Sequence, residues 1–188
     1  MAARSTWRGG FNGSIRVFPG QSCVFINGGQ ITGDVNVEGH LGLIGAMVGG
    51  NVTVGGAGSF TIAPAAMIGG HLRVKGTSPS DANDSVCGTT IGSNLHLEGS
   101  GAAAVRVGSA NPLLCTGNRI GGDLVVLDNA SAITAFDNTV TGNLVANGNT
   151  GLLDVVGNSV GGSLQCRNIP DLIMGGGNKA RRIIGQCN

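Results

Sequence analysis

Five cysteines are the residues whose spacing most directly predicts chemistry. Cys166 and Cys187 occupy neighbouring inward positions in consecutive units of a repeat described below, and Cys87 and Cys115 hold matching places in two earlier units. Since neighbouring coils bring such positions together, we expect two disulfides, which favours an oxidising compartment. Cys23 is left over, and is either a buried small apolar residue or the site of an intermolecular bond. No pair has the C-x-x-C spacing typical of zinc.

The histidines and carboxylates form no recognisable catalytic set. His40, His71 and His96 fall at different positions of different repeat units, so we interpret them as surface residues. The ten carboxylates offer no matched pair for glycoside hydrolysis, and the chain contains no nucleophile elbow, phosphate-binding loop or calcium nonapeptide. We therefore expect no catalytic, cofactor-binding or metal site and no enzyme; a polysaccharide-active enzyme is the least favoured function.

Composition favours one domain built of short strands. Of 188 residues, 36 are glycine and 41% are hydrophobic, so the chain can bury a core but is poorly suited to long helices. The net charge of +1 provides no field for nucleic acid or an anionic membrane surface. No apolar run approaches the ~20 residues of a membrane span. We expect no nucleic-acid partner and no membrane span.

A 20-residue repeat organises the C-terminal part of the chain. Asn118, Asn138 and Asn158 each begin a unit that reads Asn-x-(Val/Ile)-x-Gly-x-Leu, and Asn178 begins a fourth unit. A fixed period of this length is typical of a solenoid, in which each repeat forms one coil. These asparagines are expected to stack at one turn and to share amide hydrogen bonds between coils. The alternative is that they line a polar groove.

The same pattern extends backwards through an apolar anchor residue. Anchors fall at Phe11, Ile31, Val48, Ile68, Ile91, Ile120, Val140, Val160 and Ile183, and all but Ile91 are followed two residues later by glycine. Positions four and six after most anchors are also apolar and share one face of a strand. Position +3 is always polar, which predicts a solvent-facing stripe of Ser14, Asp34, Asn51, His71, Asn94, Asp123, Asn143, Ser163 and Gln186. A second apolar set comprises Val24/Ile26, Leu41/Leu43, Phe60/Ile62, Leu113/Cys115, Ile133/Ala135 and Leu153/Val155.

These patterns predict an all-β, single-domain parallel β-helix of about nine coils of ~20 residues, with at least two strands per coil and right-handed winding favoured. Residues 1–10 are expected to form an N-terminal extension or cap, and residues 11–188 the β-helix. Longer intervals between anchors predict loop insertions near 75–90 and 98–117, the second with Val105 and Val107 as an extra strand.

Two groups of proteins share these motifs. The stretch Ile31 to Val37, ITGDVNV, resembles the bactofilins, which are polymer-forming bacterial cytoskeletal β-helices. The run from Gly157 to Cys187, together with VFPGQSCVF near the start, is similar to small secreted β-helical proteins of actinobacteria, mostly of unknown function. The first resemblance implies end-to-end assembly into filaments without nucleotide. Bactofilins usually lack this cysteine framework.

We therefore expect a structural, self-assembling protein, joined end to end as an extracellular or cell-surface filament subunit. Trp7, Phe11, Ile183 and Ile184 would make the apolar contacts of a head-to-tail joint, or would instead plug the ends of the rod. The alternative function is a monomeric secreted or surface binding module acting through the loops at 75–90 and 98–117. No signal peptide opens the sequence, so either a leader has been removed or the protein is cytoplasmic.

Overall fold

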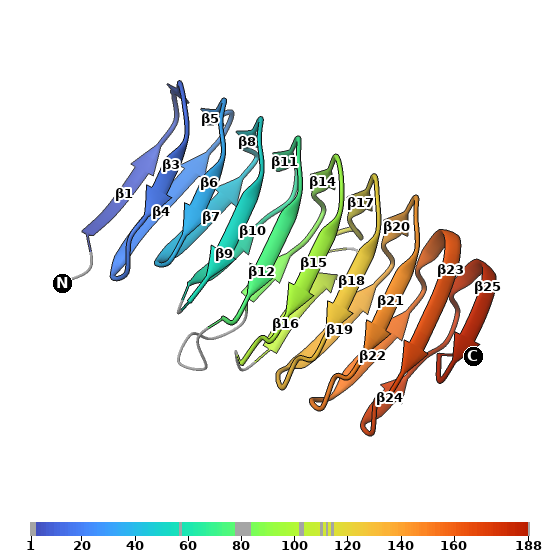
Figure 1. Ribbon diagram of the computed structural model, residues 1–188. Helices are drawn as coiled ribbons and strands as arrows, with labels where there is room; N and C mark the ends of the chain where they lie inside the picture. Colours follow the sequence, from blue (N-terminus) through green and yellow to red (C-terminus); the bar gives the residue numbers. More distant parts are fainter. Residues whose placement is uncertain are drawn as a thin grey trace.

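The chain is a β-solenoid with three strands in each turn (Figure 1). The structure is a computed structural model, and it describes residues 3–56, 58–77, 84–101, 104–109, 111, 113 and 115–187. These residues contain 25 strands and no helix, and all strand pairs are parallel. The two ends of the chain lie at opposite ends of the stack (Figure 1). The predicted all-β parallel solenoid is thus confirmed.

Sheet A is one wall of the solenoid and contains nine stacked strands. They are β1 (Ala3–Trp7), β4 (Gln21–Ile26), β7 (His40–Ile44), β10 (Ser59–Ile62), β13 (Asp84–Val86), β16 (Ala104–Gly108), β19 (Ala132–Phe136), β22 (Leu153–Val156) and β24 (Leu172–Met174). Because β1 pairs with β4, the solenoid pairing begins before Phe11, the boundary that the repeat indicated. Nine strands are separated by eight steps, and the solenoid has about eight turns, slightly fewer than the nine coils expected.

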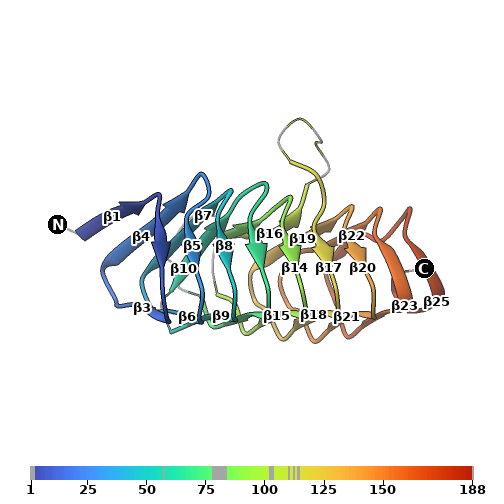
Figure 2. The same cartoon turned by 90° about the horizontal axis from the view of Figure 1, so that it is seen from above.

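Sheet B forms the other two walls, which we call the short-strand arm and the long-strand arm. The short-strand arm contains β2 (Gly10–Phe11), β5 (Gln30–Ile31), β8 (Met47–Val48), β11 (Met67–Ile68), β14 (Thr90–Ile91), β17 (Arg119–Ile120) and β20 (Thr139–Val140). The long-strand arm contains β3 (Ile15–Val17), β6 (Val35–Val37), β9 (Val52–Gly55), β12 (Leu72–Lys75), β15 (Leu95–Glu98), β18 (Leu124–Leu127) and β21 (Leu144–Asn147). In the last two turns the arms merge, because β23 (Ser159–Arg167) and β25 (Lys179–Gly185) run through both. Figure 2 shows the strands side by side along the rod.

The anchors and the residues four and six positions after them fill the core, as the alternation predicts. From the second coil onward, most of these side chains are 0–1% exposed. On sheet A the sequence interpretation is wrong in two coils. In β4 it is Phe25, in register with Leu43, that is buried, and Val24 faces outward over Gly42. Phe60 and Ile62, in β10, are fully buried, as the second apolar set predicts.

The second error concerns the enlarged coil. Its sheet A residues are Val105 and Val107, in register with Ile133 and Ala135, so the expected extra strand is the wall strand itself. Leu113 is 92% exposed and lies in a segment between β16 and β17 that projects sideways from the rod (Figure 2). The sequence pattern assigned Leu113 and Cys115 to this wall because they lie seven and five residues before the anchor Ile120. That assignment fails because the projection lengthens the interval between the wall strand and the anchor.

The last coil was also placed out of register by the sequence pattern. Ile183 pairs with Leu164 and is therefore not an anchor, whereas Ala180 pairs with Val160 and occupies the anchor position. A register shift between Val160 and Ser163 separates the two pairings. The spacing of 20 residues is thus kept up to the anchor position, and it falls to 19 after the shift. The motif Ile183-Ile184-Gly185 merely imitates an anchor followed by glycine.

Three corners join the walls of each turn. Corner 1 lies between sheet A and the short-strand arm, corner 2 between the two arms, and corner 3 between the long-strand arm and sheet A. At corner 1 a left-handed residue recurs in seven turns, with φ between 49° and 71°: Asn27, Gly45, Ala65, Gly88, Asp137, Gly157 and Gly177. Glycine dominates because a side chain is strained in this conformation.

Corner 2 needs glycine for a different reason, close packing between coils. A Cβ atom added to Gly122 would lie 1.9 Å from the Oδ1 atom of Asn94, and one added to Gly142 would lie 2.2 Å from the Oδ1 atom of Asp123. Real Cβ atoms are essentially never this close to another heavy atom. The glycine at position +2 therefore leaves room for the polar side chain of the preceding coil.

Candidate functional site

A ladder of buried asparagines runs along corner 1. Asn118, Asn138 and Asn158 are 0–1% exposed. The Oδ1 atom of Asn118 accepts the backbone N–H of Thr89, and each later Oδ1 atom, up to that of Asn178, accepts the backbone N–H of the asparagine one coil earlier, all at 2.9–3.0 Å. Each Nδ2 atom donates to the next Oδ1 atom and to a strand carbonyl of the preceding coil. These amides are fully used within the stack. The expected stacking is confirmed, and the buried amides do not line a groove.

Corner 3 carries a second buried ladder that the sequence reasoning missed. Asn129 and Asn149 are 0% and 1% exposed, and the Oδ1 atom of Asn149 accepts both the backbone N–H and the Nδ2 group of Asn129. Asn129 in turn accepts the backbone N–H of Ser100, whose hydroxyl contacts that of Thr77. The signal was present in the sequence, since Asn129 and Asn149 are also 20 residues apart.

The polar stripe at position +3 forms a third ladder, along corner 2. In seven coils the side chain at this position accepts the backbone N–H of the next coil at 2.7–3.2 Å, and the acceptors are Ser14, Asp34, Asn51, His71, Asn94, Asp123 and Asn143. Ser163 ends the ladder by donating its own N–H to Asn143. The interpretation as a stripe that only faces solvent was therefore incomplete. What these residues share is a side-chain hydrogen-bond acceptor close to the backbone.

The cysteines pair as the repeat predicts. Cys87 is bonded to Cys115, with Cα atoms 5.9 Å apart, and Cys166 is bonded to Cys187, with Cα atoms 5.5 Å apart. Cys23 is free and half-buried against the N-terminal end of the core. Burial raises the pKa of its thiol, which disfavours the reactive thiolate. The environment of Cys23 is thus that of a small apolar residue.

The two ends of the solenoid differ in chemistry. At the N-terminal end Trp7 is 47%, Phe11 37% and Phe18 49% exposed, and Trp7 stacks on Phe25 with ring centroids 6.3 Å apart. Phe11 occupies an anchor position, but in the described chain no coil precedes it, whereas the next anchor, Ile31, is fully buried.

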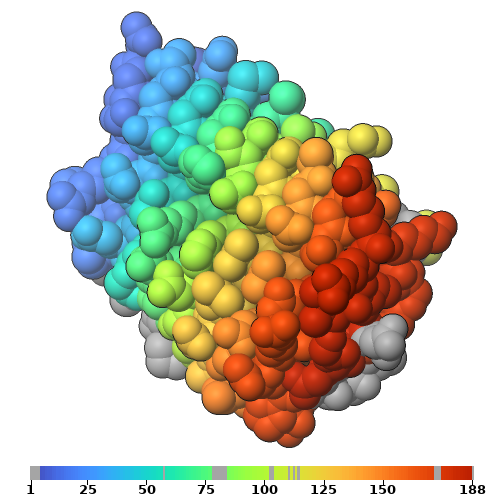
Figure 3. Space-filling model, turned by 45° about the vertical axis from the view of Figure 1, so that its right-hand side comes forward, coloured from blue at the N-terminus to red at the C-terminus, as the bar shows by residue number. Residues whose placement is uncertain are grey.

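At the C-terminal end Gln186 closes the last turn. Its Oε1 atom accepts the N–H of Ile169 at 3.0 Å and its Nε2 atom donates to the carbonyl of Ile169 at 2.7 Å. Ile183 and Ile184 are half-buried, and Ile183 packs against the core. Figure 3 turns this end forward and shows the last coil, in red, open at the surface.

The two predicted loops lie only partly within the described residues. Residues 78–83 of the first lie outside them, as do residues 102, 103, 110, 112 and 114 of the second. The buried Asp84 closes the first loop by accepting the N–H of Phe60 at 2.9 Å. The Cys87–Cys115 disulfide ties the base of the second loop to the coil below. Residues of the two predicted loops are in direct contact, because β13 pairs with β16 and the N–H of Gly101 donates to the carbonyl of Thr77 at 3.3 Å.

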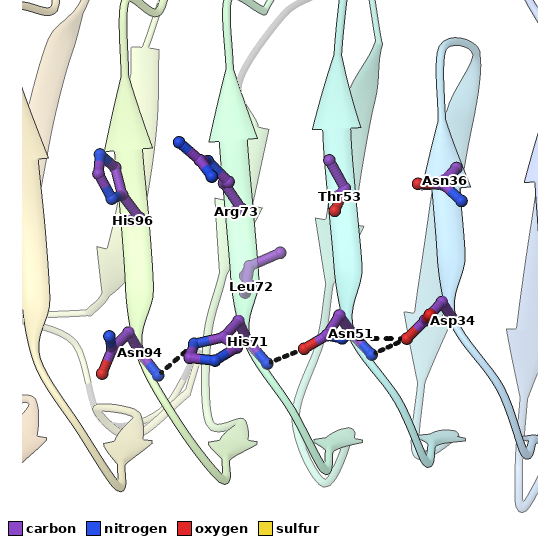
Figure 4. Close-up of a pocket in the computed structure, with 9 residues that line it drawn as sticks. All are labelled: Asp34, Asn36, Asn51, Thr53, His71, Leu72, Arg73, Asn94 and His96. Carbon is purple, nitrogen blue, oxygen red and sulfur yellow. Dashed lines mark hydrogen bonds between the residues drawn. The ribbon is translucent and has the colours of Figure 1, made fainter.

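A polar groove lies on the long-strand arm (Figure 4). It has a volume of about 420 Å³ and crosses β6, β9, β12 and β15. Its lining consists of Asp34, Asn36, Asn51, Thr53, His71, Leu72, Arg73, Asn94 and His96. Four of these belong to the corner 2 ladder, and Asn36, Thr53, Arg73 and His96 form a second row in register.

Charged side chains flank this groove. Glu98 lies 3.1 Å from Lys75, 3.9 Å from Arg73 and 3.5 Å from the Nε2 atom of His96. The hydrogen bond from Lys75 lowers the pKa of Glu98. Desolvation lowers the pKa of His96 more than Glu98 raises it, so this imidazole favours its neutral form.

Within the described residues, no group of three or more His, Cys, Asp or Glu side chains is placed to hold a metal ion. The same residues include no helix of the length and apolar character that a bilayer crossing requires. The site is a polar hollow on the long-strand arm, flanked by ion pairs. Comparison with models of protein families, with curated proteins and with solved structures finds no match to this chain.

Proposed function

We propose that this protein is a structural, non-catalytic β-solenoid that associates with itself end to end. The observation that carries the proposal is the N-terminal coil, where Trp7, Phe11 and Phe18 are each exposed and the three strands are paired on one side only among the described residues. Strand edges of this kind invite pairing with another chain. Large exposed aromatic side chains add apolar area to such a contact.

Head-to-tail contact suits this geometry best. All walls of the solenoid are parallel sheets, and a second copy placed head to tail would continue each of them in the same direction. If two like ends met, the two copies would wind about the rod axis in opposite directions. Their facing strands would then be antiparallel, and the parallel pairing could not continue on the three walls. A head-to-tail contact is heterologous and does not close on itself, so its product is a filament. In that joint, Trp7 and Phe11 would face the edges of β24 and β25, near Ile183 and Ile184.

An extracellular or cell-surface location is part of this proposal. Its support is the pair of disulfides, which are rare in reducing compartments. They tie the last coil and the projecting loop to the rod.

Light scattering and electron microscopy of the purified chain test the proposal. We expect filaments whose length grows with protein concentration, and Trp7→Ser should shorten them. The same change should lower the thermal unfolding temperature of the monomer modestly, because the stacking on Phe25 is lost. Leu152→Ser is the matched control, because Leu152 is 50% exposed but lies on the flank of the rod. Monomers at high concentration, or equal loss of assembly in both variants, would refute end-to-end association.

A further inference from the structure

The groove on the long-strand arm contains polar groups that the fold does not use. In the ladder row, Asp34, Asn51 and His71 accept backbone N–H groups from coil to coil. In the second row, the side chains of Asn36 and Thr53 make no hydrogen bond to any described residue. Among the described residues, the guanidinium of Arg73 has one ion-pair partner, Glu98, at 3.9 Å. The two rows therefore differ, one being structural and the other free to bind.

His96 adds a further unused group. Its Nε2 atom is buried from solvent and has no hydrogen-bond partner among the described residues, although the Glu98 carboxylate lies 3.5 Å away. A buried polar atom without a partner is costly and is often satisfied by a ligand or a water molecule. In Figure 4, His96 and Arg73 lie beside each other at one end of the row, with Thr53 and Asn36 beyond them.

The row has defined ends. In register beyond His96 come Val125 and then Val145, which offer no side-chain hydrogen bond. Beyond Asn36 comes Arg16, whose guanidinium is held by Glu38 at 2.6 Å. The unused groups are thus confined to four strands, which at a spacing of ~4.8 Å cover roughly 14 Å along the rod.

The charge of the groove is balanced. Asp34 and Arg73 carry opposite charges within the lining, Lys75 and Glu98 pair beside it, and His96 favours its neutral form. A polyanion would be repelled by the carboxylates of Asp34 and Glu98, and a polycation would be repelled by Arg73 and Lys75. Amide, hydroxyl, carboxylate and guanidinium groups in alternation match a ligand whose own groups both donate and accept, as hydroxyls do.

We propose that this groove binds a short stretch of an uncharged oligosaccharide, lying along the rod axis across β6, β9, β12 and β15. Arg73 donates hydrogen bonds to sugar hydroxyls and offers the flat face of its guanidinium for stacking. Asn36 and Thr53 each donate and accept, and the Oδ2 atom of Asp34 accepts. An extended peptide fits less well, because its residues repeat at ~3.4 Å and not at the strand spacing of ~4.8 Å.

Titration of the intact ¹⁵N-labelled chain with cellotetraose, chitotetraose and maltotetraose, followed by NMR in low-salt buffer, tests this inference. At least one neutral probe should shift the amide signals of Asn36, Thr53, Arg73 and His96. Arg73→Gln should weaken that binding about 10-fold or more, since it removes hydrogen bonds from a charged donor. Arg119→Gln, on the short-strand arm, is the matched control and should bind as the unchanged chain does.

Several outcomes would overturn the inference. One is that none of the three probes shifts these signals at concentrations well above a millimolar dissociation constant. Another is that shifts occur only in residues 98–109, which would place binding on the loop. Tighter binding of tetragalacturonate than of the neutral probes would show that the site selects an anion. Equal affinity of Arg73→Gln and Arg119→Gln would remove Arg73 from the site.

Discussion

Asn138 illustrates how much of the stability of this fold depends on single amides. Its Oδ1 atom accepts two donors from Asn118, and its Nδ2 atom donates to the carbonyl of Val107 and to Asn158. Asn138→Ala leaves at least two buried donors on Asn118 without a partner. Each such group costs about 1–3 kcal/mol, so we expect a loss of roughly 3–5 kcal/mol in the free energy of unfolding, measured with urea.

Asn143→Ala is the control for this change. Asn143 belongs to the corner 2 ladder, has the same 20-residue spacing and is exposed, so water can replace its hydrogen bonds. Its loss should be below about 1 kcal/mol. Similar losses in the two variants would mean that burial of the ladder contributes little.

Ala65 occupies a conformation that its side chain disfavours. Its φ of 64° matches the glycines above and below it at corner 1. Ala65→Gly removes a strain of about 1–2 kcal/mol and costs about 0.4–1 kcal/mol in unfolded-chain entropy, so the melting temperature should rise slightly. Gly45→Ala, at φ 58° with no atom closer than 3.9 Å to the added Cβ, should lower it. A fall in both variants would contradict this account.

His96 predicts a pH dependence of stability. Desolvation holds its pKa in the folded state below the ordinary value, so the folded chain binds fewer protons than the unfolded chain as the solution is acidified. Its contribution to stability is fully present above the unfolded-state pKa of ~6.5 and is lost as pH falls through the folded-state pKa. His96→Gln should reduce the fall of the urea midpoint between neutral and mildly acidic pH. An unchanged pH profile would assign that fall to other groups.

Some of the ladder and groove residues could be recognised in the sequence by their residue type, and others could not. The corner 1 ladder could be predicted because asparagine itself recurs every 20 residues. The corner 2 ladder could not be recognised from identity, because Asp34, Asn51 and His71 share only an acceptor at similar reach. The groove row was missed for a related reason: register between coils, rather than spacing within one coil, brings Thr53 beside Arg73.

Coils of this fold differ in length, and the fold tolerates the difference when the extra residues lie in the segments that connect one wall to the next. The long-strand arm keeps its register through all turns up to β21, while the enlarged coil places its additional residues in the lateral projection. This explains why the fold class was predictable although individual coils were misaligned. In the last coil Ile183 misled the pattern, whereas Asn178 had the right period, because a ladder residue is constrained by both neighbouring coils.

The Cys166–Cys187 disulfide should matter most for the last coil. Its loop of about 20 residues predicts a stabilisation of about 3 kcal/mol. Replacing both cysteines with serine should expose the amides of β24 and β25 to hydrogen exchange before those of β18 and β21. Cys23→Ser, which breaks no disulfide, is the control and should leave this order unchanged. Uniform loss of protection along the rod would show that the disulfide stabilises the whole solenoid equally.

The whole molecule has charge of one sign at both ends. Arg4, Arg8 and Arg16 occur in the first 20 residues, and Lys179, Arg181 and Arg182 in the last 14, with no Asp or Glu in either segment. All ten carboxylates lie between them. A head-to-tail joint therefore brings basic groups together, although Arg16 is already paired with Glu38.

Assembly should consequently depend on salt. Raising ionic strength from about 0.01 to 0.1 M shortens the screening length from ~30 to ~10 Å and weakens repulsion between the ends. We expect longer filaments at the higher salt concentration, measured by light scattering at constant protein concentration. The variant Arg181→Gln/Arg182→Gln should assemble at low salt. Filaments that dissolve as salt is added would instead indicate a joint held by opposite charges.

The ladders also make the rod extensible. The unit from Asn138 to Gly157 offers a ladder amide, a corner glycine and matching strands to the coil on either side. A tandem copy of that unit would meet the same neighbours and would lengthen the rod by one strand spacing, ~4.8 Å. Duplication of the gene segment that encodes one coil can therefore lengthen such a protein in equal steps of one strand spacing.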